Sequence, residues 1–134
     1  MPDKTKVALY CRVANEDDDA IANQESILRK YSAEHGYDNI TVYVDNGVSG
    51  LNFDRPALSR LETDIAAGNI GTVIVRNFDR IGREFIMAQD WIVNIRRKGV
   101  SFISIADGLD DSLFDEKRLT MLEVLASQKI FAKK

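Results

Sequence analysis

The chain has 134 residues, of which 45% are hydrophobic and 29% are charged, and its formal net charge is −3. This length and composition indicate one soluble globular domain and exclude disordered, collagen-like and membrane-spanning proteins. The pI of about 5.2 also excludes a protein that binds nucleic acid through overall positive charge, so any contact with DNA has to come from a local cluster.

Four short apolar runs, each bounded by polar residues, have the pattern of strands that are buried on both faces. They span residues 7–11, 40–44, 72–75 and 100–105. Segments of helical period separate them, and strands that alternate with helices favour a parallel sheet. We therefore expect an α/β fold, a three-layer sandwich with helices on both faces of a mainly parallel central sheet.

Three helices are predicted between these strands, and each has an apolar stripe at steps of three and four residues. The stripes consist of Ile21, Leu28 and Tyr31 in the first helix, Leu58, Leu61 and Ile65 in the second, and Phe85, Ala88, Ile92 and Ile95 in the third. Pro56 is well placed as the first residue of the second helix. Gln24 lies inside the first stripe, so a polar amide is expected among buried apolar side chains.

A last helix is expected from about Glu116 to the end of the chain. Its apolar positions, including Leu119, Leu122 and Leu125, cover more than one face. This is more than a helix that lies on a sheet requires, so we expect a second partner, either another subunit or a further part of the chain. The helical pattern continues to Lys134, and we interpret residues 1–134 as one domain truncated within its last helix.

Four arginines follow predicted strands, at the edge of a parallel sheet where binding sites occur. They are Arg12, Arg55, Arg80 and Arg83. We expect Arg80 and Arg83 at the start of the third helix, where the helix dipole disfavours cations unless an anion binds there. Guanidinium groups and free helix amides suit phosphate oxygens. The alternative is that these arginines are solvated or paired with nearby carboxylates.

Three further residues have both a structural and a functional interpretation. Asp79 is either the N-cap of the third helix or a group that orients an arginine or handles a proton. Asp45 belongs to the turn that Asn46-Gly47 predicts, or to the site. Gln24 either satisfies a backbone group or faces the site, because a buried amide without partners is costly.

Metal and nucleotide sites are not indicated by the sequence. One histidine and one cysteine, Cys11, form no metal constellation, and neither G-x-x-x-x-G-K-[ST] nor G-x-G-x-x-G occurs. We therefore expect no cofactor and no metal ion. A single cysteine also allows no internal disulfide and favours a cytoplasmic setting, and the sequence predicts no membrane partner.

At this point the sequence resembles the N-terminal catalytic domain of the serine site-specific recombinases, which are the resolvases, invertases and large serine integrases. Six fragments carry the resemblance, in order and over nearly the whole chain. They are YCRVA, NQ, VDNGVSG, DRPAL, FDRIGRE and KGVSFISIADG. Each fragment alone is weak, but six in the family's order are specific.

The resemblance implies a DNA strand transferase of a mobile element or phage-type integrase, without metal or ATP. In that family a serine attacks a DNA phosphodiester, forms a 5′-phosphoserine link, and subunits of a tetramer exchange strands. The four arginines would bind the scissile phosphate, and Asp79 would organise them or transfer a proton. Gln24 and Asp45 would support them. The last helix would be the subunit interface, and a separate C-terminal domain, outside this sequence, would supply most DNA affinity.

One departure is central, because Ala14 stands at the nucleophile's position. A methyl group cannot attack phosphorus, so we expect this chain to be deficient in cleavage. The alanine is an engineered substitution, a natural loss of the nucleophile, or a sign of misalignment, which the order of the other motifs disfavours. Residues 16–19 are acidic in a segment where the family often carries polar amides, which would be unfavourable near a phosphate.

Two other functions stay open from the sequence. The chain would be a naturally inactive, recombinase-like regulatory subunit that binds DNA or a partner through its last helix. Alternatively, it would be a general α/β module that binds a small phosphorylated ligand at the arginine cluster.

Overall fold

The computed structural model describes residues 6–48, 55–77, 80–81 and 85–106, with side chains of the last range described from residue 88. Strands and helices alternate in the order β1 (Val7–Val13), α1 (Asp18–Glu34), β2 (Ile40–Asn46), α2 (Pro56–Ala66), β3 (Thr72–Val75), α3 (Phe85–Arg97) and β4 (Ser101–Ser104). The four strands form one sheet in the order β2-β1-β3-β4, and every pairing between them is parallel. The expected α/β fold is confirmed.

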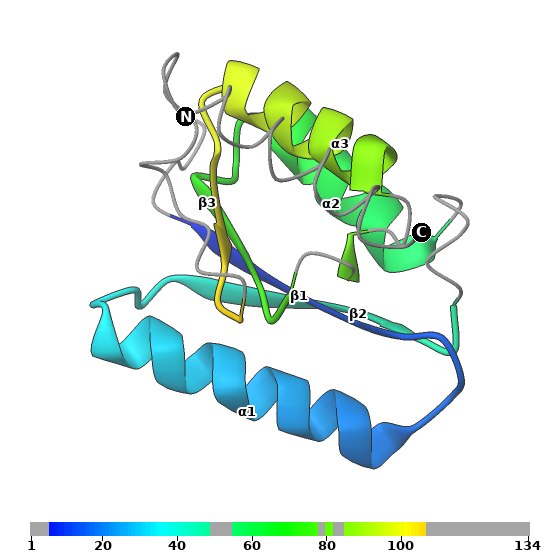
Figure 1. The fold of residues 1–134 in the computed structure, drawn as a ribbon. Coiled ribbons are helices and arrows are strands. Elements are labelled where there is room, and N and C mark those ends of the chain that lie inside the picture. The colour runs from blue at the N-terminus through cyan, green and yellow to red at the C-terminus, as the bar shows by residue number, and fades with distance from the viewer. Residues whose placement is uncertain (1–5, 49–54, 78–79, 82–84, 107–134) are drawn as a thin grey trace.

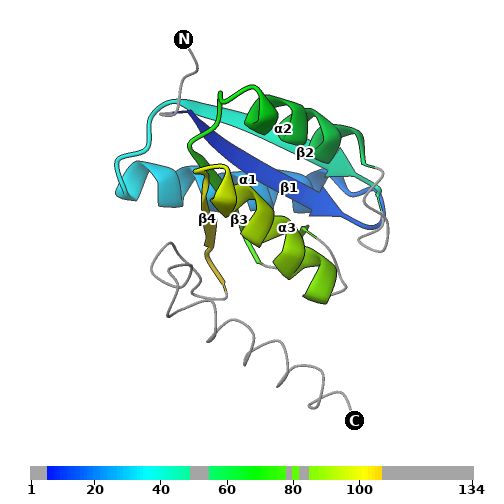
Figure 2. The same cartoon turned by 90° about the horizontal axis from the view of Figure 1, so that it is seen from above.

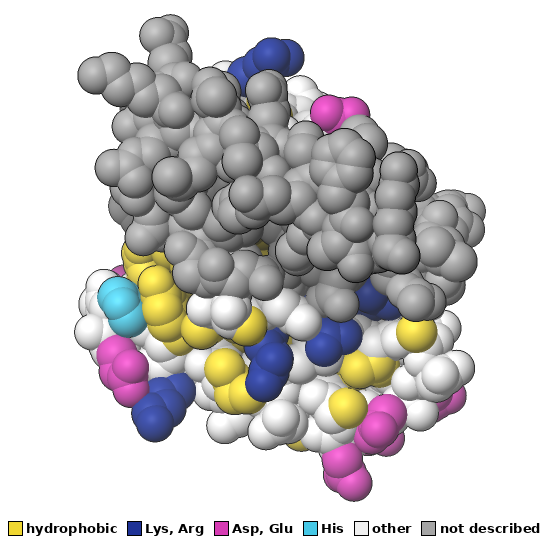
Figure 3. All heavy atoms as spheres, viewed as in Figure 1, with side chains coloured by type: hydrophobic (Ala, Val, Ile, Leu, Met, Phe, Trp, Pro, Cys, Tyr) yellow, Lys and Arg dark blue, Asp and Glu magenta, His cyan; other side chains and the backbone are white. Residues whose placement is uncertain are grey.

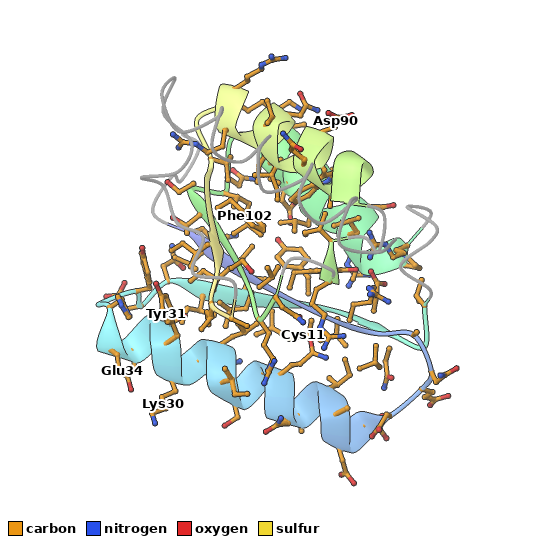
Figure 4. All side chains as sticks on the ribbon, in the orientation of Figure 1. Cys11, Lys30, Tyr31, Glu34, Asp90 and Phe102 are labelled. Carbon is orange, nitrogen blue, oxygen red and sulfur yellow. The ribbon has the colours of Figure 1, made fainter. Side chains whose placement is uncertain are left out.

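The sheet is the middle of three layers. α1 covers one face, and α2 and α3 cover the other (Figures 1 and 2). The central strand β1 alternates between the two cores: Val7, Leu9 and Cys11 pack on the side of α1, and Ala8 and Tyr10 pack on the opposite side. Figure 4 shows this division, with Cys11 between the sheet and α1, and Phe102 between the sheet and the other two helices.

The predicted apolar stripes face the sheet. α1 buries Ile21, Leu28 and the expected Gln24, but it also buries Ser32, whereas Tyr31 is only partly buried. The Ser32 hydroxyl donates to the carbonyl oxygen of Leu28 at 2.8 Å, which satisfies it within the core.

The other two helices follow the prediction as well. α2 begins at Pro56, as expected, and its predicted stripe is buried against the sheet. α3 buries Ala88, Ile92 and Ile95, whereas the side chain of Phe85 lies outside the described residues.

Strands β1 and β2 extend two residues beyond the apolar runs in the sequence. Their register pairs Arg12 with Asp45 and Val13 with Asn46, so polar residues continue the ladder. Arg12 and Asp45 are each only 3% exposed. Arg12 is bonded to Gln24, Val48 and Arg80, and Asp45 is bonded to the first residues of α2. The extension therefore carries polar side chains into the interior at the carboxyl ends of the strands.

Two expectations lie outside the described residues. These are the last helix with Leu119, Leu122 and Leu125, and the truncation of the domain within that helix. In the part of the chain that the structure describes, no helix has the length and apolar character needed to cross a bilayer.

Candidate active site

The connections from β1 diverge at the carboxyl end of the sheet. The chain passes from β1 through α1 to β2 on one side, and then returns through α2 to β3 on the other side of β1. Open parallel sheets bind ligands where the direction of strand order changes in this way, just beyond the carboxyl ends of the strands. Here that point lies between β1 and β3.

Arg12 comes from the end of β1 and is almost completely buried. Its Nε donates to the carbonyl oxygen of Arg80 at 3.1 Å, and its Nη1 donates to the carbonyl oxygen of Val48 at 3.0 Å. The guanidinium group therefore lies between the turn after β2 and the chain beyond β3.

Arg55 is the residue directly before α2, and its side chain is fully buried. Its Nη1 donates to the carbonyl oxygen of Arg80 at 2.9 Å, and its Nη2 donates to that of Ile81. The guanidinium carbon lies 5.7 Å from the centre of the Tyr10 ring, within range of a cation–π interaction. Burial lowers the pKa of Arg55, and the nearby Tyr10 and Asp45 oppose that shift.

Arg80 corrects one expectation. We expected it in the first turn of the third helix, but in the described part of the chain α3 begins at Phe85. Arg80 instead lies in a tight turn, where its amide donates to the carbonyl oxygen of Asn77 at 3.1 Å. In this turn the Arg80 carbonyl oxygen accepts from two guanidinium groups, those of Arg12 and Arg55.

The Arg80 side chain returns to β1. Its Nη1 donates to the carbonyl oxygen of Arg12 at 3.1 Å. Its Nε is buried and has no hydrogen-bond partner among the residues that the structure describes. A buried donor of a charged group is unfavourable when it stays unsatisfied, so this atom is suited to an incoming acceptor. The structure thus brings together three of the four predicted arginines, while Arg83 lies outside the described residues.

Gln24 holds the main chain of Arg12. Its Oε1 accepts from the amide of Arg12 at 3.2 Å, and its Nε2 donates to the carbonyl oxygen of the same residue at 2.9 Å. Of the two interpretations that the sequence left open, the structure therefore shows the one in which the amide satisfies backbone groups. It does so at the residue that carries an arginine of the site.

Asp45 binds the beginning of α2. Its carboxylate accepts from the amides of Ala57 and Leu58 at 2.9 and 3.1 Å, and from the hydroxyl of Tyr10 at 2.8 Å. Arg55, the residue at the N-cap position of α2, makes no side-chain cap bond. Asp45 of β2 therefore supplies the N-cap interaction for this helix.

Tyr10 is a residue of this site that the sequence analysis missed. Its ring faces Arg55 and its hydroxyl binds Asp45, so it contacts two of the predicted polar residues at once. One signal was available, because a tyrosine in a strand buried on both faces needs a partner for its hydroxyl.

Ala14 lies in the short exposed loop between β1 and α1. The acidic residues that follow it belong to the beginning of α1, where Asp17 is the N-cap and Asp18 and Asp19 lie in the first turn. Figure 3 shows acidic side chains over this end of the helix. The helix dipole favours negative charge there, which gives these acids a structural reason.

Two remaining questions concern Asp79 and metals. Asp79 lies outside the described residues, so the choice between an N-cap and a proton-handling group stays a prediction. Within the described ranges, no three His, Cys, Asp or Glu side chains come together in a way that could hold a metal ion.

Comparison with known proteins identifies the family. The sequence profile described as "Resolvase, N terminal domain" matches residues 7–133. The chain belongs to the resolvase N-terminal domain family. The resemblance to serine recombinases that the sequence analysis found is thereby confirmed.

Three relatives show how far this resolvase-family similarity extends. A Bacillus subtilis (strain 168) protein named "Putative DNA recombinase" is 28% identical over 100 residues, which are 74% of this chain and 20% of that protein. The probable DNA-invertase y4cG of Sinorhizobium fredii (strain NBRC 101917 / NGR234) is 29% identical over 107 residues, 77% of this chain and 30% of that protein. The chain thus spans less than a third of either relative.

A solved structure, the N-terminal catalytic domain of TP901-1 integrase, matches with a TM-score of 0.79 and 29% identity. The match covers 96% of each chain. The described residues therefore have the fold of a resolvase-family catalytic domain.

Proposed function

We propose that this chain is the catalytic domain of a DNA site-specific serine recombinase. Because it has Ala14 at the position of the nucleophile, we propose that it binds the scissile phosphate but does not cleave the DNA strand. The observation that carries the proposal is the convergence of Arg12, Arg55 and Arg80 at the carboxyl ends of β1 and β3. Three guanidinium groups within one hydrogen-bonded cluster are suited to a dianionic phosphoryl transition state.

The proposed roles follow the chemistry of each group. Arg12, Arg55, Arg80 and Arg83 bind the phosphate and stabilise the charge that it gains when the nucleophile adds. Asp79 organises the arginines or transfers a proton. Gln24 holds the Arg12 backbone and Asp45 holds the start of α2, so both act through other residues.

Phosphate binding in this site requires an exchange of acceptors. In the described arrangement Arg12 and Arg55 donate to the carbonyl oxygens of Val48, Arg80 and Ile81. An anionic oxygen is the stronger acceptor for a guanidinium group, so a phosphate takes over some of these donors. The buried Nε of Arg80 gives it one more.

The missing nucleophile explains why we propose binding without cleavage. With a serine at position 14, its hydroxyl oxygen attacks phosphorus and its proton leaves to a base, while the 3′-oxygen of DNA departs and takes up a proton from a general acid or from water. The product is a 5′-phosphoserine ester and a free 3′-hydroxyl. An alanine side chain has no lone pair, and loss of a nucleophile in an enzyme costs about 10⁶ in rate.

The test restores the nucleophile in the full-length gene product. The Ala14→Ser protein is incubated with a library of duplex DNA that carries a random core, and covalent adducts are isolated under denaturing conditions and sequenced. We expect an adduct through the 5′-phosphate at a defined sequence. The matched control is Ala33→Ser, which adds the same hydroxyl at an exposed position near the end of α1 and should give no adduct. A folded Ala14→Ser protein without any adduct would contradict the proposal.

A second candidate function is favoured by Ala14 itself. A recombinase-like subunit that lacks a nucleophile is able to regulate an active homologue by joining its oligomer. Self-association is proposed to use Leu119, Leu122 and Leu125 of the last helix, as a dimer or tetramer. Analytical ultracentrifugation of the Leu122→Lys, Leu125→Lys double variant checks this, and an unchanged oligomeric state would remove its support.

A further inference from the structure

The last residue of β2 and the turn that follows it, residues 46–48, hold both ends of the loop that contains Ala14. At one end, the amides of Gly47 and Val48 donate to the carbonyl oxygen of Val13 at 2.9 and 3.0 Å. At the other end, the side chain of Asn46 accepts from the amide of Asp17 at 2.9 Å. Residues 14–16 therefore span the short distance between two fixed points that one turn supplies.

Asn46 makes two contacts of opposite polarity. Its Oδ1 accepts from the Asp17 amide, and its Nδ2 donates to the carboxylate of Asp18 at 2.8 Å. An amide group suits this pair, because a carboxylate has no donor and an alkyl group offers neither. Asp17 in turn caps α1 through Ala20 at 3.0 Å, so Asn46 ties the end of β2 to the first turn of the helix.

The same turn also binds the Arg12 guanidinium, whose Nη1 donates to the carbonyl oxygen of Val48. The backbone of Gly47 packs against Glu16. A Cβ added at Gly47 would lie 3.4 Å from the Glu16 amide nitrogen. Figures 1 and 2 show the ends of β1 and β2 side by side where the chain turns into α1. The same turn therefore holds both the loop that contains position 14 and the guanidinium group of Arg12.

We propose that Asn46 is a positioning residue that fixes residue 14 relative to the Arg12 guanidinium. This rests on the proposed function, in which position 14 carries the nucleophile and Arg12 binds the phosphate. Without the Asn46 bonds, the Asp17 end of the loop is held only indirectly, through α1 and through the packing of Glu16 on Gly47, whereas Val13 keeps its two bonds to the turn. A displacement of about 1 Å in a reacting group costs on the order of 100-fold in rate, so one amide side chain has a large effect without touching DNA.

The first measurement uses the chain as it is, with Ala14. Hydrogen exchange of the amides of residues 14–17 is compared between the parent and Asn46→Leu, and we expect faster exchange in the variant, with the amides of β1 unchanged. Asn23→Leu is the matched control, because it makes the same substitution at an exposed position of α1, and it should leave the loop unchanged. Unchanged exchange in Asn46→Leu overturns the proposal independently of any cleavage.

The second measurement is a rescue that a general loss of stability would not produce. Asn46→Asp keeps the acceptor for the Asp17 amide but opposes the Asp18 carboxylate, and it should also speed exchange in the loop. In the double variant Asn46→Asp, Asp18→Asn, the two side chains exchange roles: the amide at position 18 donates to the carboxylate at position 46. That carboxylate still accepts from the amide of Asp17. The double variant should recover the slow exchange of the parent, and a double variant as fast as Asn46→Asp alone overturns the proposal.

The third measurement takes these variants into the Ala14→Ser full-length protein on the duplex found by the adduct screen. At saturating protein, Asn46→Leu should slow adduct formation about 10- to 100-fold, with the dissociation constant for DNA unchanged. The double variant should regain most of the rate. An Asn46→Leu rate equal to that of Ala14→Ser contradicts the positioning role, whereas an absent adduct in Ala14→Ser itself contradicts only the proposed function.

Discussion

Arg12 and Arg80 each bind the main chain of the other. Nη1 of Arg80 donates to the carbonyl oxygen of Arg12, and Nε of Arg12 donates to the carbonyl oxygen of Arg80, both at 3.1 Å. These two bonds join the end of β1 to the chain beyond β3. The position of each guanidinium group therefore depends on the other residue, and a change in one is transmitted to both.

Arg12→Lys should lower the free energy of unfolding by about 1–3 kcal/mol. A lysine keeps the charge but has a single ammonium group, which cannot reach the carbonyl oxygens of Arg80 and Val48 in the geometry of the guanidinium fork. Denaturant unfolding followed by circular dichroism measures the loss. Arg29→Lys is the control, since Arg29 forms an exposed ion pair with Glu25 and should change stability by less than about 0.5 kcal/mol. Equal losses in the two variants would contradict the role of Arg12.

Tyr10→Phe should lower the free energy of unfolding by about 1.5–3 kcal/mol. The variant removes a hydroxyl that donates to the Asp45 carboxylate, and Asp45 also holds the first amides of α2. Tyr43→Phe is a close comparison, because the Tyr43 hydroxyl donates to Asp64 within α2 at 2.5 Å. Thermal and denaturant unfolding should show the larger loss for Tyr10→Phe, and the reverse order would argue against the coupling to α2.

Gly47→Ala and Gly36→Ala should each lower the free energy of unfolding by about 1 kcal/mol. Both glycines have positive φ, 87° and 77°, a backbone conformation that side chains with a Cβ rarely adopt. A Cβ at Gly47 would meet Glu16 at 3.4 Å, an ordinary van der Waals distance, and nothing lies within 4 Å at Gly36, so the backbone sets the cost at both positions. Denaturant unfolding measures the two losses. A variant as stable as the parent would contradict the positive φ of its glycine.

Stability should fall above pH 8.5 in part through Cys11. Burial raises the pKa of the Cys11 thiol to about 12, and Glu25 adds to the shift. An unfolded thiol ionises near pH 8.5, so above that pH the unfolded state binds fewer protons than the folded state. The contribution is therefore complete below about pH 8.5 and is lost as the pH rises towards 12, by at most about 1.4 kcal/mol per pH unit.

Denaturant unfolding between pH 8 and 10 measures this dependence, with Cys11→Ala as the comparison. The alanine variant should show a shallower decrease because it has no thiol to ionise. Identical slopes in the two proteins would show that Cys11 does not contribute. Burial also raises the pKa values of Tyr10 and Tyr43, which steepen the decrease in both proteins only near and above pH 10.

Local patterns were sufficient to predict the four strands, the three helices between them and the polar residue in the first helix. The apolar stripes repeat within one helix, and Gln24 is conspicuous because its neighbours at helical spacing are apolar. The convergence of Arg12, Arg55 and Arg80 followed from the rule that parallel strands bring their carboxyl ends to one edge.

The partners of these residues were not predictable in the same way. The Arg80 carbonyl receives two guanidinium groups from sites 25 and 68 residues away, and no local pattern encodes such a pairing. The same holds for Asp45, which caps a helix that begins 11 positions later, and for the Tyr10 ring near Arg55. The expected helical start at Arg80 was wrong: in the described part of the chain α3 begins at Phe85, and Arg80 lies in a turn.

The long sequence separations in the arginine cluster also determine when it can form. The bonds between Arg12 and Arg80 span 68 residues, and that between Arg12 and Val48 spans 36. Closing such loops has an entropic cost that the contacts themselves must offset. On the ribosome, a nascent chain that ends before residue 80 contains the sequences of β1 and β2 but lacks the residue that joins Arg12 and Arg55. The proposed phosphate site therefore requires β3 and the turn beyond it, as well as β1.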